Sequence, residues 1–136
     1  PMSEHIPPTA EERVENAKRL VDKLNIEHSK IYIDALAVSV ASDHTSIKTT
    51  LDSIAAIHKA LPDVHIICGA SNISFGLPKR EIINTAFLIA AIYAGLDSAI
   101  IDITRDAIRQ AIAAGLLIAG KDEFCMEYIS YIRENE

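Results

Sequence analysis

The chain has little cysteine and a minority of basic residues, and each shortage excludes a class of protein. Two cysteines among 136 residues, Cys68 and Cys125, cannot build the disulfide framework of a small secreted domain. We interpret both as buried thiols, the usual state of free cysteine. Lys and Arg number 13 against 19 Asp and Glu, and the net charge is −6. This balance argues against nucleic-acid binding, which depends on neutralising phosphates with Lys and Arg.

Long apolar runs are also missing. Apolar residues make up 49% of the chain, yet no run approaches the roughly 20 residues that a transmembrane helix needs. Residues 1–15 are polar and acidic, unlike a signal peptide. The histidines have no metal-ligand spacing and no cysteine cluster beside them, so zinc-dependent chemistry is not predicted. We therefore expect a cytoplasmic α/β domain without a membrane partner.

The spacing of apolar residues predicts alternating helices and strands. Thr9 and Glu12 form a capping-box pattern at the start of a helix, and Gly95 is placed like the residue that ends one. Helices are expected over 9–24, 43–61, 79–94, 105–119 and 123–133, and strands over 30–40, 64–68 and 98–103. This order predicts a parallel sheet. An open doubly wound sheet and a barrel fit the periodicity equally well.

Polar side chains stand at or near the ends of all three predicted strands. These are Asp34, Asn72 and Asp102. Because ligands bind beyond the carboxyl ends of parallel strands, and adjacent strands lie about 4.8 Å apart, the three side chains could converge on one small polar ligand. Asp34 could instead be a turn or capping residue, and Asp102 could equally cap the following helix. Around Asn72, Gly69 and Gly76 would let the backbone turn tightly close to a ligand.

Four segments together resemble the pterin-binding methyltransferases. They are Ser71–Ser74 followed by Arg80 and the apolar helix 82–94, Ile31-Tyr32-Ile33-Asp34, Ala94-Gly95-Leu96-Asp97, and Ala99-Ile100-Ile101-Asp102. Proteins of this family move the N5 methyl group of methyltetrahydrofolate to the cobalt of a corrinoid. The resemblance implies a (β/α)8 TIM barrel, methyltetrahydrofolate as methyl donor, and a cobalamin or other corrinoid carried by a partner protein, such as a corrinoid/iron–sulfur protein.

The same resemblance assigns roles to individual residues. Asp34 would hold the pterin ring, although Ala35 stands where the family usually has proline. Asn72 would be the catalytic residue, with its hydrogen bond near N5. Ser71, Ser74 and Asp102 would add substrate contacts, or serve to stabilise the loops. Lys79 and Arg80 would face either an anionic part of the ligand or solvent.

Length limits how much of a barrel this chain can form. A complete (β/α)8 barrel typically needs about 250 residues, and the chain has 136. We therefore expect residues 1–136 to be the C-terminal half of the barrel domain, with the N-terminal half missing. Exposed sheet edges tend to pair with another chain, so we also expect a homodimer. Two alternatives are an inactive barrel fragment that acts as an oligomerising module, and the folate-binding region of a cobalamin-dependent methionine synthase.

Overall fold

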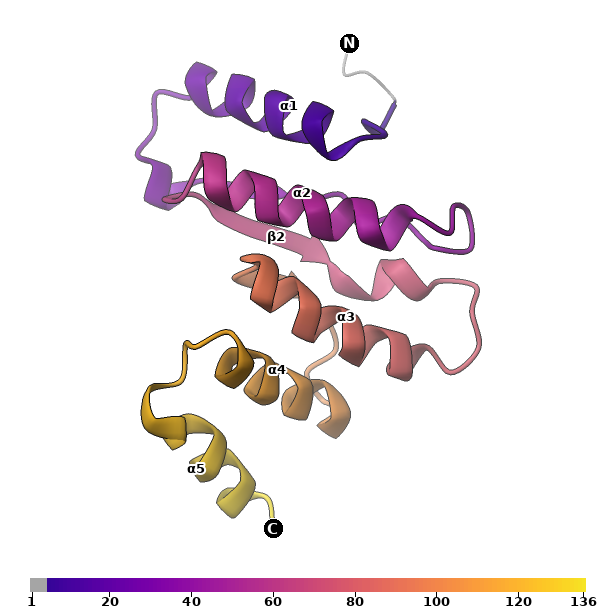
Figure 1. Ribbon diagram of the computed structural model, residues 1–136, viewed down its shortest axis with the longest axis vertical. Helices are drawn as coiled ribbons and strands as arrows, with labels where there is room; N and C mark the ends of the chain where they lie inside the picture. Colours follow the sequence, from indigo (N-terminus) through magenta and orange to yellow (C-terminus); the bar gives the residue numbers. More distant parts are fainter. Residues whose placement is uncertain (1–4) are drawn as a thin grey trace.

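Helices and strands alternate along the chain in the computed structural model, which describes residues 5–136 (Figure 1). In chain order the elements are α1 (Ala10–Lys23), η1 (His28–Lys30), β1 (Tyr32–Asp34), α2 (Ser46–Ala60), β2 (His65–Gly69), η2 (Ala70–Ser74), α3 (Arg80–Ala94), β3 (Ser98–Ile100), α4 (Asp106–Ile118), η3 (Glu123–Cys125) and α5 (Met126–Glu134), where η marks a 3₁₀ helix. The predicted order of helices and strands is confirmed. Helices α1 and α5 lie at opposite ends of the molecule (Figure 1).

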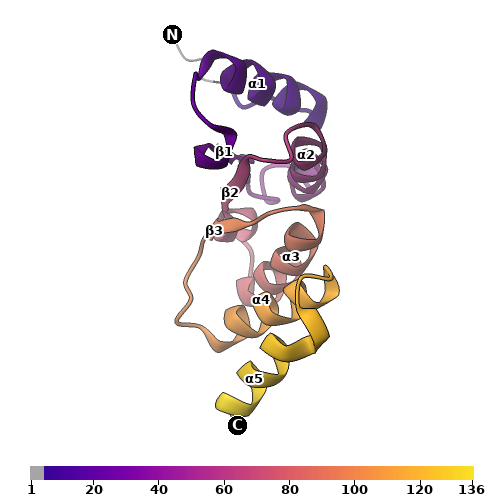
Figure 2. The same cartoon turned by 90° about the vertical axis from the view of Figure 1, so that its left-hand side faces the viewer.

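The three strands form one parallel sheet in the order β1-β2-β3. Asp34 lies opposite Ile67 in the first pair, and Gly69 lies opposite Ile100 in the second. Helices α1 to α4 all lie on the same side of this sheet (Figure 2). A doubly wound sheet carries helices on both faces, whereas a barrel carries them only outside. The predicted fold, part of a (β/α)8 barrel, is confirmed.

The two faces of the sheet differ in burial. Ile33, Ile66 and Cys68 face the helices and are at most 9% exposed. Their neighbours point to the opposite face, because successive side chains in a strand alternate. We call it the uncovered face, and it consists of Tyr32, Asp34, His65, Ile67, Gly69, Ser98 and Ile100. Tyr32 is 57% exposed and Ile100 is 69% exposed. In a closed barrel these side chains would fill the interior.

Local signals place the helix ends largely as predicted. Thr9 is the N-cap of α1, and its hydroxyl accepts a hydrogen bond from the Glu12 amide at 3.2 Å. Gly95 ends α3 with a φ of 123°, a conformation that side chains rarely adopt. Ahead of α2, the Asp43 carboxylate accepts a bond from the Thr45 amide at 2.9 Å.

Two predicted strands are much shorter in the structure. The strand expected over 30–40 is reduced to Tyr32–Asp34, because residues 28–30 form η1 and Leu36 adopts a left-handed φ of 59°. The strand expected over 98–103 ends at Ile100, which pairs with the last residue of β2. The apolar residues beyond these points belong to loops, so continuous hydrophobicity overestimated strand length.

The C-terminal helix expected over 123–133 is interrupted near its start. Phe124 and Cys125, the last two residues of η3, have φ values of 57° and 60°, which interrupt the helical conformation before α5. The Asp122 carboxylate then accepts hydrogen bonds from the amides of Glu127 and Tyr128, both at 2.9 Å. The helix therefore begins at Met126 with a side chain that satisfies its first free amides.

The two cysteines have different surroundings. Cys68 is buried, as predicted, but Cys125 is exposed, because it is the last residue of η3, directly before α5, rather than a residue on a packed helix face. The interpretation of Cys125 as a buried thiol is wrong. Within residues 5–136, no helix is both long and apolar enough to cross a membrane.

Candidate functional site

Asp34 is the last residue of β1, on the uncovered face. Its Oδ1 atom accepts a hydrogen bond from the Leu36 amide at 2.8 Å, which fixes the plane of the carboxylate. Among the described residues, the other oxygen, Oδ2, has no hydrogen-bond donor. An exposed carboxylate oriented in this way can accept N–H groups from a ligand.

Asn72 lies in η2, three residues beyond the end of β2, and is exposed. A methyl group built on Gly69 would lie 2.8 Å from Asn72 Nδ2, so the carboxamide folds back against Gly69 at the end of the strand. Gly69 belongs to the uncovered face. The amide of Asn72 and the carboxylate of Asp34 are therefore presented at the carboxyl ends of neighbouring strands.

Ser74 and Arg80 hold η2 in place. Ser74 is fully buried, and its Oγ donates to Asn84 Oδ1 at 2.7 Å and accepts from Arg80 Nε at 2.9 Å. Arg80 also donates through Nη2 to the Ser71 carbonyl at 2.7 Å, and its guanidinium lies 5.8 Å from the centre of the Phe75 ring. Arg80 is thus not simply a solvated surface residue. The geometry of Ser74 is that of a loop-stabilising residue.

The loop after β1 is bonded directly to the segment after β2. The Val40 amide donates to the Ile73 carbonyl at 2.9 Å, and Ser39 Oγ donates to the Phe75 carbonyl at 2.6 Å. Asp34 directly precedes the first of these segments, and Asn72 is the neighbour of Ile73 in the second. Their relative position is therefore fixed by cross-loop hydrogen bonds as well as by the pairing of β1 with β2.

Ser71 and Asp102 meet in a depression between α3 and α4. Its volume is about 310 Å³, and it is lined by Ser71, Arg80, Glu81, Asn84, Ile101, Asp102, Arg105 and Ile108. Arg105 donates to Glu81 Oε2 through Nε at 2.9 Å and through Nη2 at 2.6 Å, which joins the two helix starts. Asp34 and Asn72 are not among the lining residues. The predicted site residues thus fall into two groups.

Asp102 is exposed and makes a local turn with Thr104. Its Oδ1 accepts from the Thr104 hydroxyl at 2.6 Å and from the Thr104 amide at 3.0 Å. These bonds, the hydroxyl first, lower the pKa of Asp102, and the charge of Arg105 contributes in the same direction. Asp102 thus stabilises the turn before α4 (Asp106–Ile118) but does not cap this helix, whose N-cap residue is Arg105.

The buried thiol beneath Asp34 is unsuited to nucleophilic catalysis. Burial, and to a lesser extent the charge of Asp34, raises the pKa of Cys68 to about 12. Cys68 therefore keeps its proton at neutral pH, and the thiolate is the reactive form.

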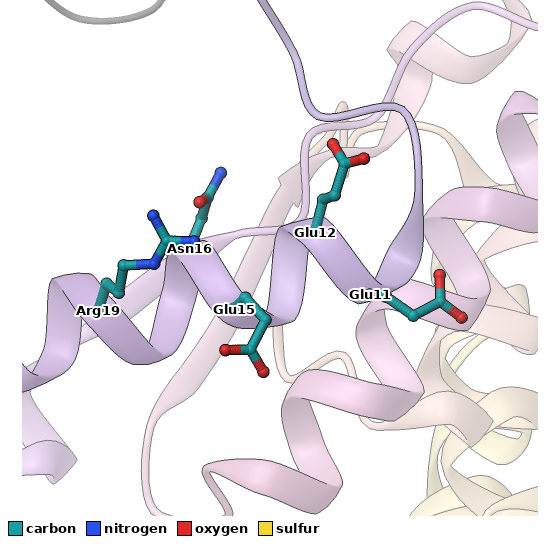
Figure 3. A pocket seen from close by; sticks show the side chains of 5 residues that line it. All are labelled: Glu11, Glu12, Glu15, Asn16 and Arg19. Atoms are coloured by element: carbon teal, nitrogen blue, oxygen red, sulfur yellow. The ribbon is translucent and has the colours of Figure 1, made fainter.

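A second hollow of about 420 Å³ lies along α1, lined by Glu11, Glu12, Glu15, Asn16 and Arg19. Figure 3 shows that these side chains point in different directions from a single helix. They do not converge on a common point, so this surface is not a candidate site. Among residues 5–136, no group of three or more His, Cys, Asp or Glu side chains is arranged to hold a metal ion.

Sequence reasoning missed Arg13. This residue is only 7% exposed and contacts the loop that follows Asp34. A signal was present, since Arg13, Ala17 and Val21 are spaced four residues apart along the buried stripe of α1. An arginine on the buried face of a helix needs hydrogen-bond acceptors, and here they are the backbone carbonyls of the loop after Asp34.

Parallel strands with helices on one face, and polar groups at their carboxyl ends, define a ligand-binding segment of a β/α barrel. The sequence comparisons specify it further. Residues 2–102 match the family described as pterin binding enzyme. The chain belongs to this family.

Curated relatives include a methylcorrinoid:tetrahydrofolate methyltransferase from Eubacterium limosum, which is 34% identical over 134 residues, or 96% of this chain and 49% of the relative. The methionine synthase of Mycobacterium tuberculosis is 37% identical over 103 residues, which is 68% of this chain and 9% of that protein. Methionine synthase from Mycobacterium leprae is also 37% identical, over 8% of its length. The chain thus spans about half of the first relative and a small part of the others.

Proposed function

We propose that this chain is part of a methyltransferase that moves the N5 methyl group of methyltetrahydrofolate to the cobalt of a corrinoid protein, and that it supplies part of the pterin site. Family membership and the names of the relatives support a reaction between a folate and a corrinoid. The observation that carries the proposal is the presentation of Asp34 and Asn72 at the ends of adjacent parallel strands. In this reading, residues 1–136 are the C-terminal part of the barrel.

Asp34 binds the pterin ring. The aminopyrimidine edge of a pterin presents N–H groups, and a carboxylate accepts such groups in charge-assisted, directional hydrogen bonds. The Leu36 amide occupies Oδ1 and leaves Oδ2 for the ligand. Such a bond contributes mainly to affinity, because it forms in the bound substrate and persists through the reaction.

Asn72 acts at N5. Methyl transfer changes the charge and protonation of N5, and a carboxamide can present an oxygen or an N–H group there without holding a charge itself. Ser71 and Ser74 contribute by supporting η2, together with Arg80. The name of the Eubacterium limosum relative gives methyl transfer from methylcorrinoid to tetrahydrofolate. A site that stabilises the transition state accelerates the reaction in both directions.

Two variants of the full-length protein that carries this chain test these roles. Asp34→Asn should weaken methyltetrahydrofolate binding about tenfold or more, the effect of losing a charged hydrogen bond, and should change the rate at saturation little. Asn72→Ala should lower the rate about 100-fold, comparable to the loss of one transition-state donor, with a smaller change in affinity. Calorimetric titration measures affinity, and the absorbance of the corrinoid in single turnovers measures the rate.

Matched controls lie at the opposite ends of the strands. Asp63→Asn and Asn25→Ala alter exposed residues that precede β2 and β1, and both should leave affinity and rate unchanged. If Asp34→Asn and Asn72→Ala behave like these controls, the site assignment is wrong. A full-length protein that binds methyltetrahydrofolate but methylates no corrinoid would instead favour a non-catalytic pterin-binding module.

A further inference from the structure

Arg13 is a buried arginine that, among the described residues, donates hydrogen bonds to three backbone carbonyls. From α1, its Nε donates to the Pro7 carbonyl at 2.9 Å, and its Nη1 donates to the carbonyls of Ala35 at 3.0 Å and Leu36 at 3.1 Å. Burial lowers the pKa of Arg13, although an arginine remains charged in this situation. The planar guanidinium spans three acceptors at fixed angles, which the point charge of a lysine cannot reproduce.

Leu36 connects this arginine to the candidate pterin site. Its carbonyl accepts from Arg13, while its amide donates to Asp34 Oδ1 at 2.8 Å. Leu36 makes both bonds with its backbone in the left-handed conformation, at a φ of 59°. This conformation is unfavourable for a residue with a Cβ atom, so it persists only where neighbouring contacts hold it.

We propose that Arg13 is a positioning residue for pterin binding: by holding the carbonyls of Ala35 and Leu36, it keeps the Leu36 amide aimed at Asp34 and so orients the carboxylate toward the ligand. This inference rests on the proposed role of Asp34. Arg13 acts through the backbone, since its hydrogen bonds within residues 5–136 go to the carbonyls of Pro7, Ala35 and Leu36.

The test compares Arg13→Met, Arg13→Lys and a matched control in the full-length protein that carries this chain. Arg19→Met is the control, because Arg19 is an exposed arginine on the same helix. A carboxylate of Asp34 that is no longer oriented makes a weaker charged hydrogen bond to the ligand. Arg13→Met should therefore weaken methyltetrahydrofolate binding about tenfold. Arg13→Lys should lie between Arg13→Met and the native protein, and Arg19→Met should match the native affinity.

Leu36→Gly separates positioning from general support of the fold. Glycine adopts positive φ freely, so a protein with glycine at this position should hold the turn without Arg13. Adding Leu36→Gly to Arg13→Met, or to Arg13→Lys if the methionine variant does not fold, should restore most of the lost affinity. Hydrogen exchange at residue 36, measured without ligand, should accelerate in the Arg13 variants and not in Arg19→Met.

Two results would overturn the proposal. One is native affinity in Arg13→Met despite lower thermal stability, which would make Arg13 a structural residue only. The other is an equal loss of affinity whether residue 36 is leucine or glycine. Failure of the proposed function gives a different result, because Asp34→Asn would then leave the affinity for methyltetrahydrofolate unchanged. In that case, the rate of hydrogen exchange at residue 36 would still show whether Arg13 holds the backbone of Leu36.

Discussion

Adding a single methyl group at Gly69 should impair the reaction without unfolding the protein. Gly69 has a φ of −76°, which alanine adopts readily, so the backbone can accept Gly69→Ala. The added carbon would lie 2.8 Å from Asn72 Nδ2 and 3.4 Å from its Cγ. The first distance is too short for a non-bonded contact, so the carboxamide must move. A displacement approaching 1 Å at a catalytic group lowers the rate about 100-fold.

Stability should change far less than the rate. Replacing glycine by alanine at a compatible position stabilises a protein by about 0.4–1 kcal/mol, and repositioning one exposed side chain removes part of that gain. We therefore expect a melting temperature near that of the native protein, together with a rate about tenfold to a hundredfold lower in single-turnover methyl transfer.

A double-mutant cycle identifies the cause. If the methyl group acts only through Asn72, then Gly69→Ala should have no further effect on the rate once Asn72 is alanine. Equal rate losses from Gly69→Ala in the native and Asn72→Ala backgrounds would refute the reasoning. So would a native rate in Gly69→Ala alone.

Three further predictions concern the scaffold. Gly95→Ala should lower the free energy of unfolding by about 2 kcal/mol or more in urea titrations, because φ is 123° and the new methyl would lie 2.6 Å from His58 Cγ; a change below about 0.5 kcal/mol would contradict this. Cys125 should react at once with a thiol reagent, and Cys68 only on unfolding. The pKa of Cys68 rises from 9.0 to about 12 on folding, so the unfolded state loses this proton at a lower pH than the folded state. The free energy of unfolding should therefore fall as the pH rises between these two pKa values, and it should fall less in Cys68→Ala. The isolated 136 residues should sediment as a dimer or larger assembly and bind methyltetrahydrofolate poorly, because β1 and β3 each have an unpaired edge in the described sheet; a monomer with micromolar affinity would contradict both expectations.

The helices were predictable because their signals are local. The hydroxyl of Thr9 and the positive φ of Gly95 determine helix ends within a few residues of sequence. Strand length depends instead on partners that are distant in sequence. Ile101 and Ile103 read as strand, but β3 ends at Ile100 because β2 has no residue to pair with them.

The sequence could place the candidate site residues at the sheet edge, but it could not predict the geometry of the loops that hold them. Asn72 follows one predicted strand, and Asp34 was placed near the C-terminal part of another, so a location of both at the carboxyl edge follows from the order of elements. The 3₁₀ helix η2, which determines the direction of Asn72, depends on Arg80 and Ser74, and these meet through loop packing. Arg13 escaped notice because the carbonyls that it holds beside Asp34, those of Ala35 and Leu36, lie more than 20 positions away in the sequence, and no side-chain motif reveals such acceptors.

The central claim is that Asp34 and Asn72 contact the pterin, and a crystal structure of the full-length protein with methyltetrahydrofolate tests it most directly. The account predicts the aminopyrimidine edge within about 3 Å of Asp34 Oδ2, and the Asn72 carboxamide within hydrogen-bond reach of N5. A pterin seated instead in the depression between α3 and α4, away from both side chains, would contradict it.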